Sequence, residues 1–188
     1  MSTTETLATG SRLTPETFAD FITRLEYHAR GEGVNDHCTA DAIFNVEQKR
    51  IVTGIDTDYT DDLIVICHEH EWFSPVDYWK DAGTSLRKKL NAKARLLTDG
   101  DTFLKATPKV QWDVLSELED HTVTGYAEEW RYVNSHFTRE AAEAYIKRKR
   151  HDYRELRIYV DANIYCWEFN AIKEALMDGR LVLVEKPQ

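Results

Sequence analysis

The sequence has few cysteines and no long hydrophobic run, and each absence narrows the kind of protein it can be. The chain has three cysteines, an odd number, at the widely spaced positions Cys38, Cys67 and Cys166. Such spacing is not a disulfide framework and favours a reducing cytosol. The longest clean apolar run is residues 63–67, far short of the ~20 residues that a membrane-spanning helix needs. The polar N-terminus has no signal-peptide core, so we expect a soluble, intracellular protein.

The chain also lacks the positive charge that is typical of general nucleic-acid-binding domains. Its 33 acidic residues outnumber 24 basic ones, and the net charge is −9. Residues 1–81 carry 16 acids and 6 bases, whereas residues 82–188 carry 17 acids and 18 bases. An acidic half of this kind either keeps the protein soluble or binds a basic surface on a partner.

Known catalytic motifs are missing as well. There is no Gly-x-Ser-x-Gly elbow, no phosphate-binding P-loop and no Gly-x-Gly-x-x-Gly turn. His37 stands beside Cys38, but adjacent residues of a strand point apart, which is a poor geometry for an activated thiol. We therefore predict a protein that is not an enzyme and has no catalytic residues and no cofactor.

What is present predicts a folded chain. Hydrophobic residues make up 42% of it, too many for a disordered protein. Residues 1–13 are polar and without periodicity, and we expect a disordered leader followed by a single domain over residues 14–188. Thr14 and Pro15 are typical of a helix start. Further helices are predicted from Pro75 to about Leu97 with a weak point at Gly83, after Thr138, and around residues 165–176.

Strands are predicted where β-branched and aromatic residues gather. The predicted segments are residues 42–55 with a polar turn near residues 47–50, and residues 63–67, 110–115, 123–133, 156–160 and 181–184. Strands that follow one another directly and alternate irregularly with helices indicate an α+β fold. We expect a mostly antiparallel sheet with three to four helices packed against it.

Several stretches, taken in order, resemble a known group of proteins. They are residues 36–46 (DHCTADAIFNV), 54–61 (GIDTDYTD), 137–142 (FTREAA), 151–154 (HDYR) and 157–160 (RIYV), with Trp167 and Glu168 after them. Their order is similar to that in small accessory proteins encoded by bacteriophages and prophages of Gram-negative bacteria, and covers about half of the chain. The resemblance implies a phage product that acts in the host cytoplasm, where such proteins often bind and disable host machinery, including CRISPR and restriction systems.

Two clusters offer alternative functions. His37 and Cys38, together with Cys67, His68 and His70, are of the residue types that bind zinc. Their spacing does not match a zinc knuckle, so we predict no metal site and keep a small His/Cys metalloprotein as an alternative. Basic residues at positions 87–89, 93, 95 and 147–151 could neutralise phosphates in a nucleic-acid-binding regulator. The alternative is that these basic residues complement helix dipoles, and we favour this second interpretation.

The densest acidic segment is residues 56–62. It has Asp61 where a calcium-binding EF-hand loop has glycine and Cys67 where that loop has glutamate, so calcium binding is not expected. We predict instead that this segment binds a host protein with a basic surface, such as a CRISPR effector, by mimicking nucleic-acid phosphates. The protein would then be a non-enzymatic anti-CRISPR or other anti-defence inhibitor. The predicted contacts are Asp56, Asp58, Asp61, Asp62, Glu69 and Glu71.

Overall fold

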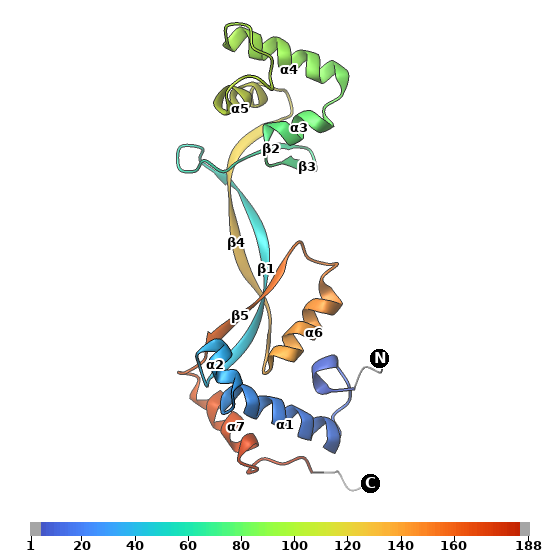
Figure 1. Ribbon diagram of the computed structural model, residues 1–188, viewed down its shortest axis with the longest axis vertical. Coiled ribbons are helices and arrows are strands. Elements are labelled where there is room, and N and C mark those ends of the chain that lie inside the picture. The colour runs from blue at the N-terminus through green and yellow to red at the C-terminus, as the bar shows by residue number, and fades with distance from the viewer. Residues whose placement is uncertain (1–4, 185–188) are drawn as a thin grey trace. The chain divides into compact units, whose positions relative to one another are not determined.

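The computed structural model describes residues 5–184, which form an α+β fold with a five-stranded sheet (Figure 1). The strand order is β3-β2-β4-β1-β5, and the α+β class with an antiparallel sheet is confirmed. Seven α-helices form within the described residues, where three to four were expected. The sequence indicated one domain, but contacts divide the chain into two compact units. The first unit comprises residues 1–50 and 130–188, and the second comprises residues 51–129.

The first unit holds most of the helices. Its elements are a 3-10 turn (η1, Leu7–Thr9), α1 (Pro15–Ala29), α2 (Gly33–His37), α6 (Arg139–Lys149), β5 (Leu156–Ala162) and α7 (Trp167–Met177), with the start of β1 (Ala42–Ile55) and the end of β4 (Thr122–His136). The Thr14 hydroxyl accepts a hydrogen bond from the Thr17 amide at 3.2 Å, as the helix-start pattern predicts. Residues 7–9, within the leader that the sequence predicts to be disordered, form the η1 turn. Residues 1–4 of that leader lie outside the described residues.

A small core joins β1 and β5 to α6 in the first unit. The two strands are antiparallel, with Asn45 opposite Tyr159 and Phe44 opposite Val160. Phe44 and Val46 are fully buried and belong to one cluster with Ala142 of α6. The alternate residues of β1 therefore face away from α6 on the other side of the sheet.

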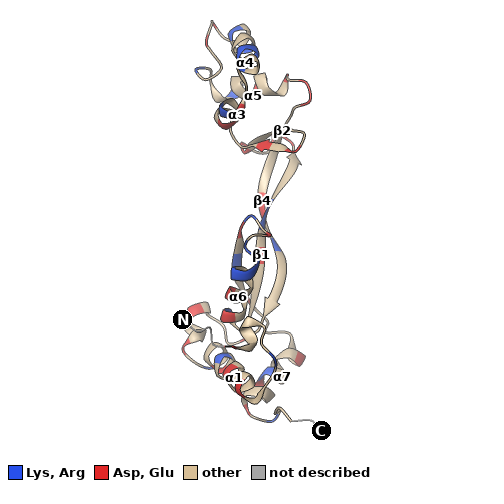
Figure 2. Ribbon diagram, turned by 90° about the vertical axis from the view of Figure 1, so that its right-hand side faces the viewer, with Lys and Arg blue, Asp and Glu red and all other residues tan. Residues whose placement is uncertain are grey.

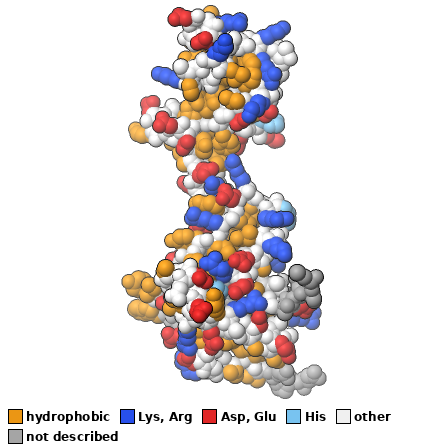
Figure 3. Space-filling view, viewed as in Figure 1, with side chains coloured by type: hydrophobic (Ala, Val, Ile, Leu, Met, Phe, Trp, Pro, Cys, Tyr) orange, Lys and Arg blue, Asp and Glu red, His pale blue; other side chains and the backbone are white. Residues whose placement is uncertain are grey.

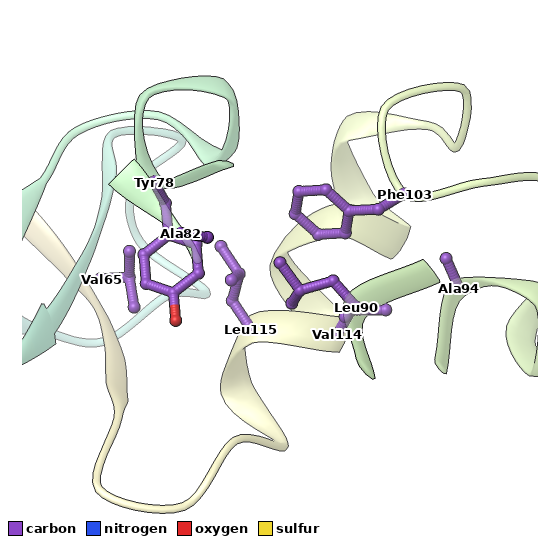
Figure 4. Close-up of a cluster of buried hydrophobic side chains, with 8 residues drawn as sticks. All are labelled: Val65, Tyr78, Ala82, Leu90, Ala94, Phe103, Val114 and Leu115. Carbon is purple, nitrogen blue, oxygen red and sulfur yellow. The ribbon is translucent and has the colours of Figure 1, made fainter. Parts of the chain in front are cut away.

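The second unit combines a hairpin with three helices. Its elements are β2 (Leu63–Cys67), β3 (His70–Trp72), α3 (Pro75–Asp81), α4 (Thr84–Leu97) and α5 (Pro108–Ser116), with the remaining parts of β1 and β4. The break between α3 and α4 falls at Gly83, as predicted. Figure 4 shows its core, in which Leu90 of α4 lies among the buried side chains Val65, Tyr78, Ala82, Ala94, Phe103, Val114 and Leu115.

Three predicted segments are wrong. Residues 110–115 form part of α5 rather than a strand, because Thr107 caps the helix and Pro108 begins it. No turn interrupts β1 at residues 47–50. Residues 181–184 form no strand. Within the described part of the chain, no helix combines the length and the hydrophobicity that crossing a membrane requires.

Candidate functional site

The negative charge of the protein is concentrated in the second unit. Residues 51–129 contain 16 acids and 8 bases, for a net charge of −8, whereas the first unit contains 17 acids and 16 bases, for −1. The acidic N-terminal half inferred from the sequence is therefore not a structural entity. In the first unit Asp41 is paired with Lys173 at 2.8 Å and Glu47 with Arg157 at 2.7 Å, so bases from the C-terminal part neutralise acids from the N-terminal part.

Four predicted contacts lie together in the loop between β1 and β2. This acidic loop comprises residues 56–62, and all four of its aspartates are exposed. The Asp58 amide donates to the Asp56 carboxylate at 3.0 Å, and the Tyr59 amide donates to the Asp56 carbonyl at 3.0 Å. Short side-chain-to-backbone bonds of this kind fix the course of a turn. The loop therefore presents its carboxylates from an ordered backbone.

The loop carboxylates are not neutralised by any cation of the described residues. Among the described residues, none of the four forms an ion pair with lysine or arginine. Other acids of the second unit do, since Asp77 pairs with Lys80 and Glu117 with Lys93, each at 2.7 Å. Uncompensated charges of one sign attract a basic partner at long range.

The base of the acidic loop is anchored on β4. The Tyr126 amide donates to the Asp62 carbonyl at 2.9 Å, and the Thr124 hydroxyl donates to the Ile55 carbonyl at 3.2 Å. Between them Gly125 has no space for a side chain, because a Cβ would lie 2.8 Å from the Ile55 carbonyl oxygen. This close approach of two backbones explains why glycine stands here.

Beside the loop lies an open hollow of about 520 Å³. Its lining residues are Ile55, Tyr59, Thr60, Asp62, Tyr126, Ala127 and Glu128. Tyr59 is 85% exposed, whereas the Tyr126 ring is held 5.1 Å from the ring of Phe73. Aromatic faces beside carboxylates suit a guanidinium or ammonium group, which gains both a cation–π contact and an ion pair.

Glu69 and Glu71 do not join the acidic loop. Glu69 lies in the turn after β2, and Glu71 lies in β3, opposite Ile66. The five residues of β2 separate them from Asp62, and a strand rises about 3.3 Å per residue. The six predicted contacts are therefore two groups at opposite ends of β2.

The proposed metal ligands are also divided. Cys67 and His70 pair across the β2–β3 hairpin, with His68 in its turn at φ 53°. His37 and Cys38 belong to the first unit, at the end of α2. Within residues 5–184, no three His, Cys, Asp or Glu side chains gather as a metal site would require.

Sequence reasoning missed a buried polar cluster in the first unit. His28 is almost fully buried, 3.1 Å from the Glu140 carboxylate and with its ring 4.9 Å from that of Phe44. His37 packs against the same Phe44, and burial, with help from His28 and Arg139, lowers its pKa. The sequence does contain a signal for the burial of His28, because this residue follows Leu25 at helical spacing on the apolar face of α1.

The basic runs are partly engaged within the protein. Lys and Arg (blue) follow α4 in Figure 2, but the Arg87 guanidinium donates to the carbonyls of Trp79 and Lys80 at 3.0 and 2.8 Å. In the other run, Lys149 pairs with Asp152 at 2.7 Å. These contacts give part of each run a structural role at a helix end.

No protein-family model, no curated protein and no solved structure matches the chain. Function must therefore be inferred from the side chains themselves. Among the features above, the acidic loop and its hollow combine uncompensated charge, exposure and an ordered backbone.

Proposed function

We propose that this chain is a binding protein without turnover, and that its acidic loop docks on a basic surface of a partner protein. The observation that carries the proposal is the group of four exposed, unpaired aspartates in residues 56–62. Their unit has a net charge of −8. A surface of this kind is attracted to lysine-rich and arginine-rich grooves.

The hollow gives this contact its specificity. An arginine of the partner would lie against Tyr59 or Tyr126 and pair with the Asp62 carboxylate. Arginine fits better than lysine, because its planar guanidinium stacks on aromatic rings and binds carboxylates with two donors. Glu69 and Glu71 lie outside this contact and add only to the long-range field.

Grooves that hold nucleic acid are the class of partner that this surface suits best. Such grooves are lined by lysine and arginine side chains that are spaced to contact the phosphates of the nucleic acid. The loop carboxylates would take the place of those phosphates. The resemblance of the sequence to phage accessory proteins supports the proposal that the partner is a host defence complex, such as a CRISPR effector, in the host cytoplasm. The protein would then be an anti-defence inhibitor that acts by occupancy.

The test compares two variants that remove the same charge from the second unit. In the loop variant Asp56, Asp58, Asp61 and Asp62 become asparagine. In the control variant the exposed acids Asp99, Asp101, Asp113 and Glu119 become the corresponding amides. The probe is a fluorescein-labelled nona-arginine peptide, with nona-lysine for comparison, and the readout is fluorescence anisotropy.

Exposed ion pairs contribute roughly 0.2–1 kcal/mol each, so losing four should weaken peptide binding about tenfold. The control variant should bind nearly as the unchanged protein does, and Tyr59→Ser should reduce the preference for arginine over lysine. Equal weakening in the two charge variants would show that net charge alone attracts the peptide, and would refute a docking site at the acidic loop.

A further inference from the structure

The β5 strand has one edge that is not paired within the chain. It stands last in the strand order, with β1 on one side only. The Lys49 amide donates to the Glu155 carbonyl at 3.0 Å, and the Asn163 amide donates to the Asp41 carbonyl at 2.9 Å. The register between these two bonds is continuous. In an antiparallel ladder bonded residues alternate, so the odd-numbered residues of β5 bond to β1.

The even-numbered residues of β5 therefore point their backbone groups outward. The N–H and C=O groups of Leu156, Ile158, Val160 and Ala162 therefore lie along the edge of β5 that no strand of the described part of the chain pairs with. The strand has no proline and no bulge to protect this edge. An open edge rich in β-branched residues is a template for pairing with another strand.

We infer that this edge pairs with the β5 strand of a second copy of the chain, antiparallel, about a two-fold axis at Tyr159. In that register Ile158 is opposite Val160 of the second copy, and Leu156 is opposite Ala162 of the second copy. These are the residues whose backbone groups point outward, so every one of their donors and acceptors gains a partner. Tyr159 meets its own counterpart on the axis, at a position that is not hydrogen-bonded.

The same register matches the charges of the strand. Arg157 lies opposite Asp161 of the second copy, and the symmetry repeats the pair on the other side of the axis. Such non-bonded pairs bring their Cα atoms to about 4.5 Å, close enough for an ion pair between the side chains. Arg157 is already oriented, because its guanidinium lies 4.2 Å from the centre of the Trp130 ring. Asp161 is exposed and forms no ion pair among the described residues.

Neighbouring registers do not achieve this match. With the axis at Ile158, Asp161 would lie opposite Glu155 of the second copy, which places like charges together. With the axis at Val160, Arg157 would lie opposite Asn163 and Asp161 opposite Tyr159. Only the register centred on Tyr159 pairs all seven residues of β5.

Exposed apolar side chains continue the surface beyond the strand. Ile164, Tyr165 and Trp167 are 52%, 87% and 77% exposed, and Figure 3 shows hydrophobic side chains gathered at the left edge, at the level of β5 and α7 in Figure 1. In the antiparallel pair the segment after Ala162 runs beside the segment before Leu156 of the second copy. These exposed apolar side chains therefore lie at the margin of the proposed interface.

The experiment measures molar mass by size-exclusion chromatography with light scattering. The unchanged protein should have about twice the chain mass of 21.9 kDa. Asp161→Arg should be monomeric, because it places arginine opposite Arg157 of the second copy. The double variant Glu47→Arg/Arg157→Glu should also be monomeric, while it keeps the pair within the chain that now joins Glu47 to Arg157. A control, Glu143→Arg on the exposed face of α6, should remain dimeric.

The decisive step is to mix the two monomeric variants. A mixed pair has arginine opposite acid at both positions, so an equimolar mixture should recover the dimer mass that neither variant shows alone. Circular dichroism confirms that each variant is folded. The inference is overturned by an unchanged protein that is monomeric up to its solubility limit, by a dimer that survives Asp161→Arg, or by a mixture that stays monomeric.

Discussion

Replacing Lys173 with methionine should destabilise the first unit strongly, because this lysine is only 3% exposed. It lies in α7, and its ammonium donates to the Ala40 carbonyl at 2.9 Å and to the Asp41 carboxylate at 2.8 Å. These two bonds attach α7 to the residues immediately before β1. Methionine preserves most of the apolar stem, so the substitution isolates the contribution of the charge.

The expected loss of stability depends on the Asp41 carboxylate, which the substitution leaves without its cation. Removing one partner of a fully buried ion pair costs about 3–5 kcal/mol. The Asp41 side chain is 32% exposed, so water can solvate part of the carboxylate that methionine would strand. We therefore expect a loss of about 2–3 kcal/mol in the free energy of unfolding for Lys173→Met. Asp41→Asn should cost only about 1 kcal/mol, because the amide oxygen and the Ala40 carbonyl still accept from the ammonium.

Urea unfolding followed by circular dichroism measures both losses, and the double variant completes a thermodynamic cycle. Residues in direct contact should show a coupling energy of at least about 0.5 kcal/mol. Lys149→Met is the matched control, since its ion pair with Asp152 is on the surface, and it should cost less than about 1 kcal/mol. If Lys173→Met costs no more than this control, the ammonium is not buried in solution and the reasoning fails.

Three further outcomes are expected. Leu90→Ala, at a fully buried position, should cost the second unit about 2–5 kcal/mol in urea unfolding. Gly125→Ala should lower its stability by about 1–3 kcal/mol and weaken nona-arginine binding, because the new methyl group would displace the base of the acidic loop. Burial lowers the pKa of His37, so the unfolded chain binds its proton more readily, and the free energy of unfolding should fall as the pH drops below 6.5. His37→Asn should show a shallower fall over the same pH range, and an unchanged slope would contradict the assignment.

Local helix signals were the most dependable part of the sequence. Thr14-Pro15 and Ser74-Pro75 begin α1 and α3, where a hydroxyl cap and a first-turn proline act within a few residues of chain. Thr107-Pro108 carries the same signal for α5. It was overlooked because Val110 and Val114 favour strands when read as an alternating pattern. Their four-residue spacing, together with the cap, fits a helix.

The continuous β1 strand could not be read locally. The polarity of residues 47–50 predicts a turn, although these residues include no glycine, proline or asparagine. Their polarity has another cause, since Glu47 pairs with Arg157 of β5 and Lys49 lies 5.6 Å from the Trp130 ring of β4. Both partners are more than 80 residues away in the sequence. Glu47 and Lys49 are therefore polar because they contact other strands, and not because the chain turns here.

The sequence predicted only part of the candidate site, again because contacts between distant segments cannot be read locally. Counting charges along the chain located the aspartates of residues 56–62 but assigned them to an acidic half that does not exist as a unit. Two acids before residue 51 are paired with basic residues from the C-terminal part, Asp41 with Lys173 and Glu47 with Arg157, because the fold brings these segments together. Charge that can act on a partner is only the charge that folding leaves unpaired. In this chain the four loop aspartates meet that condition, because their loop is fixed by its own backbone bonds and none of them forms an ion pair with a described lysine or arginine.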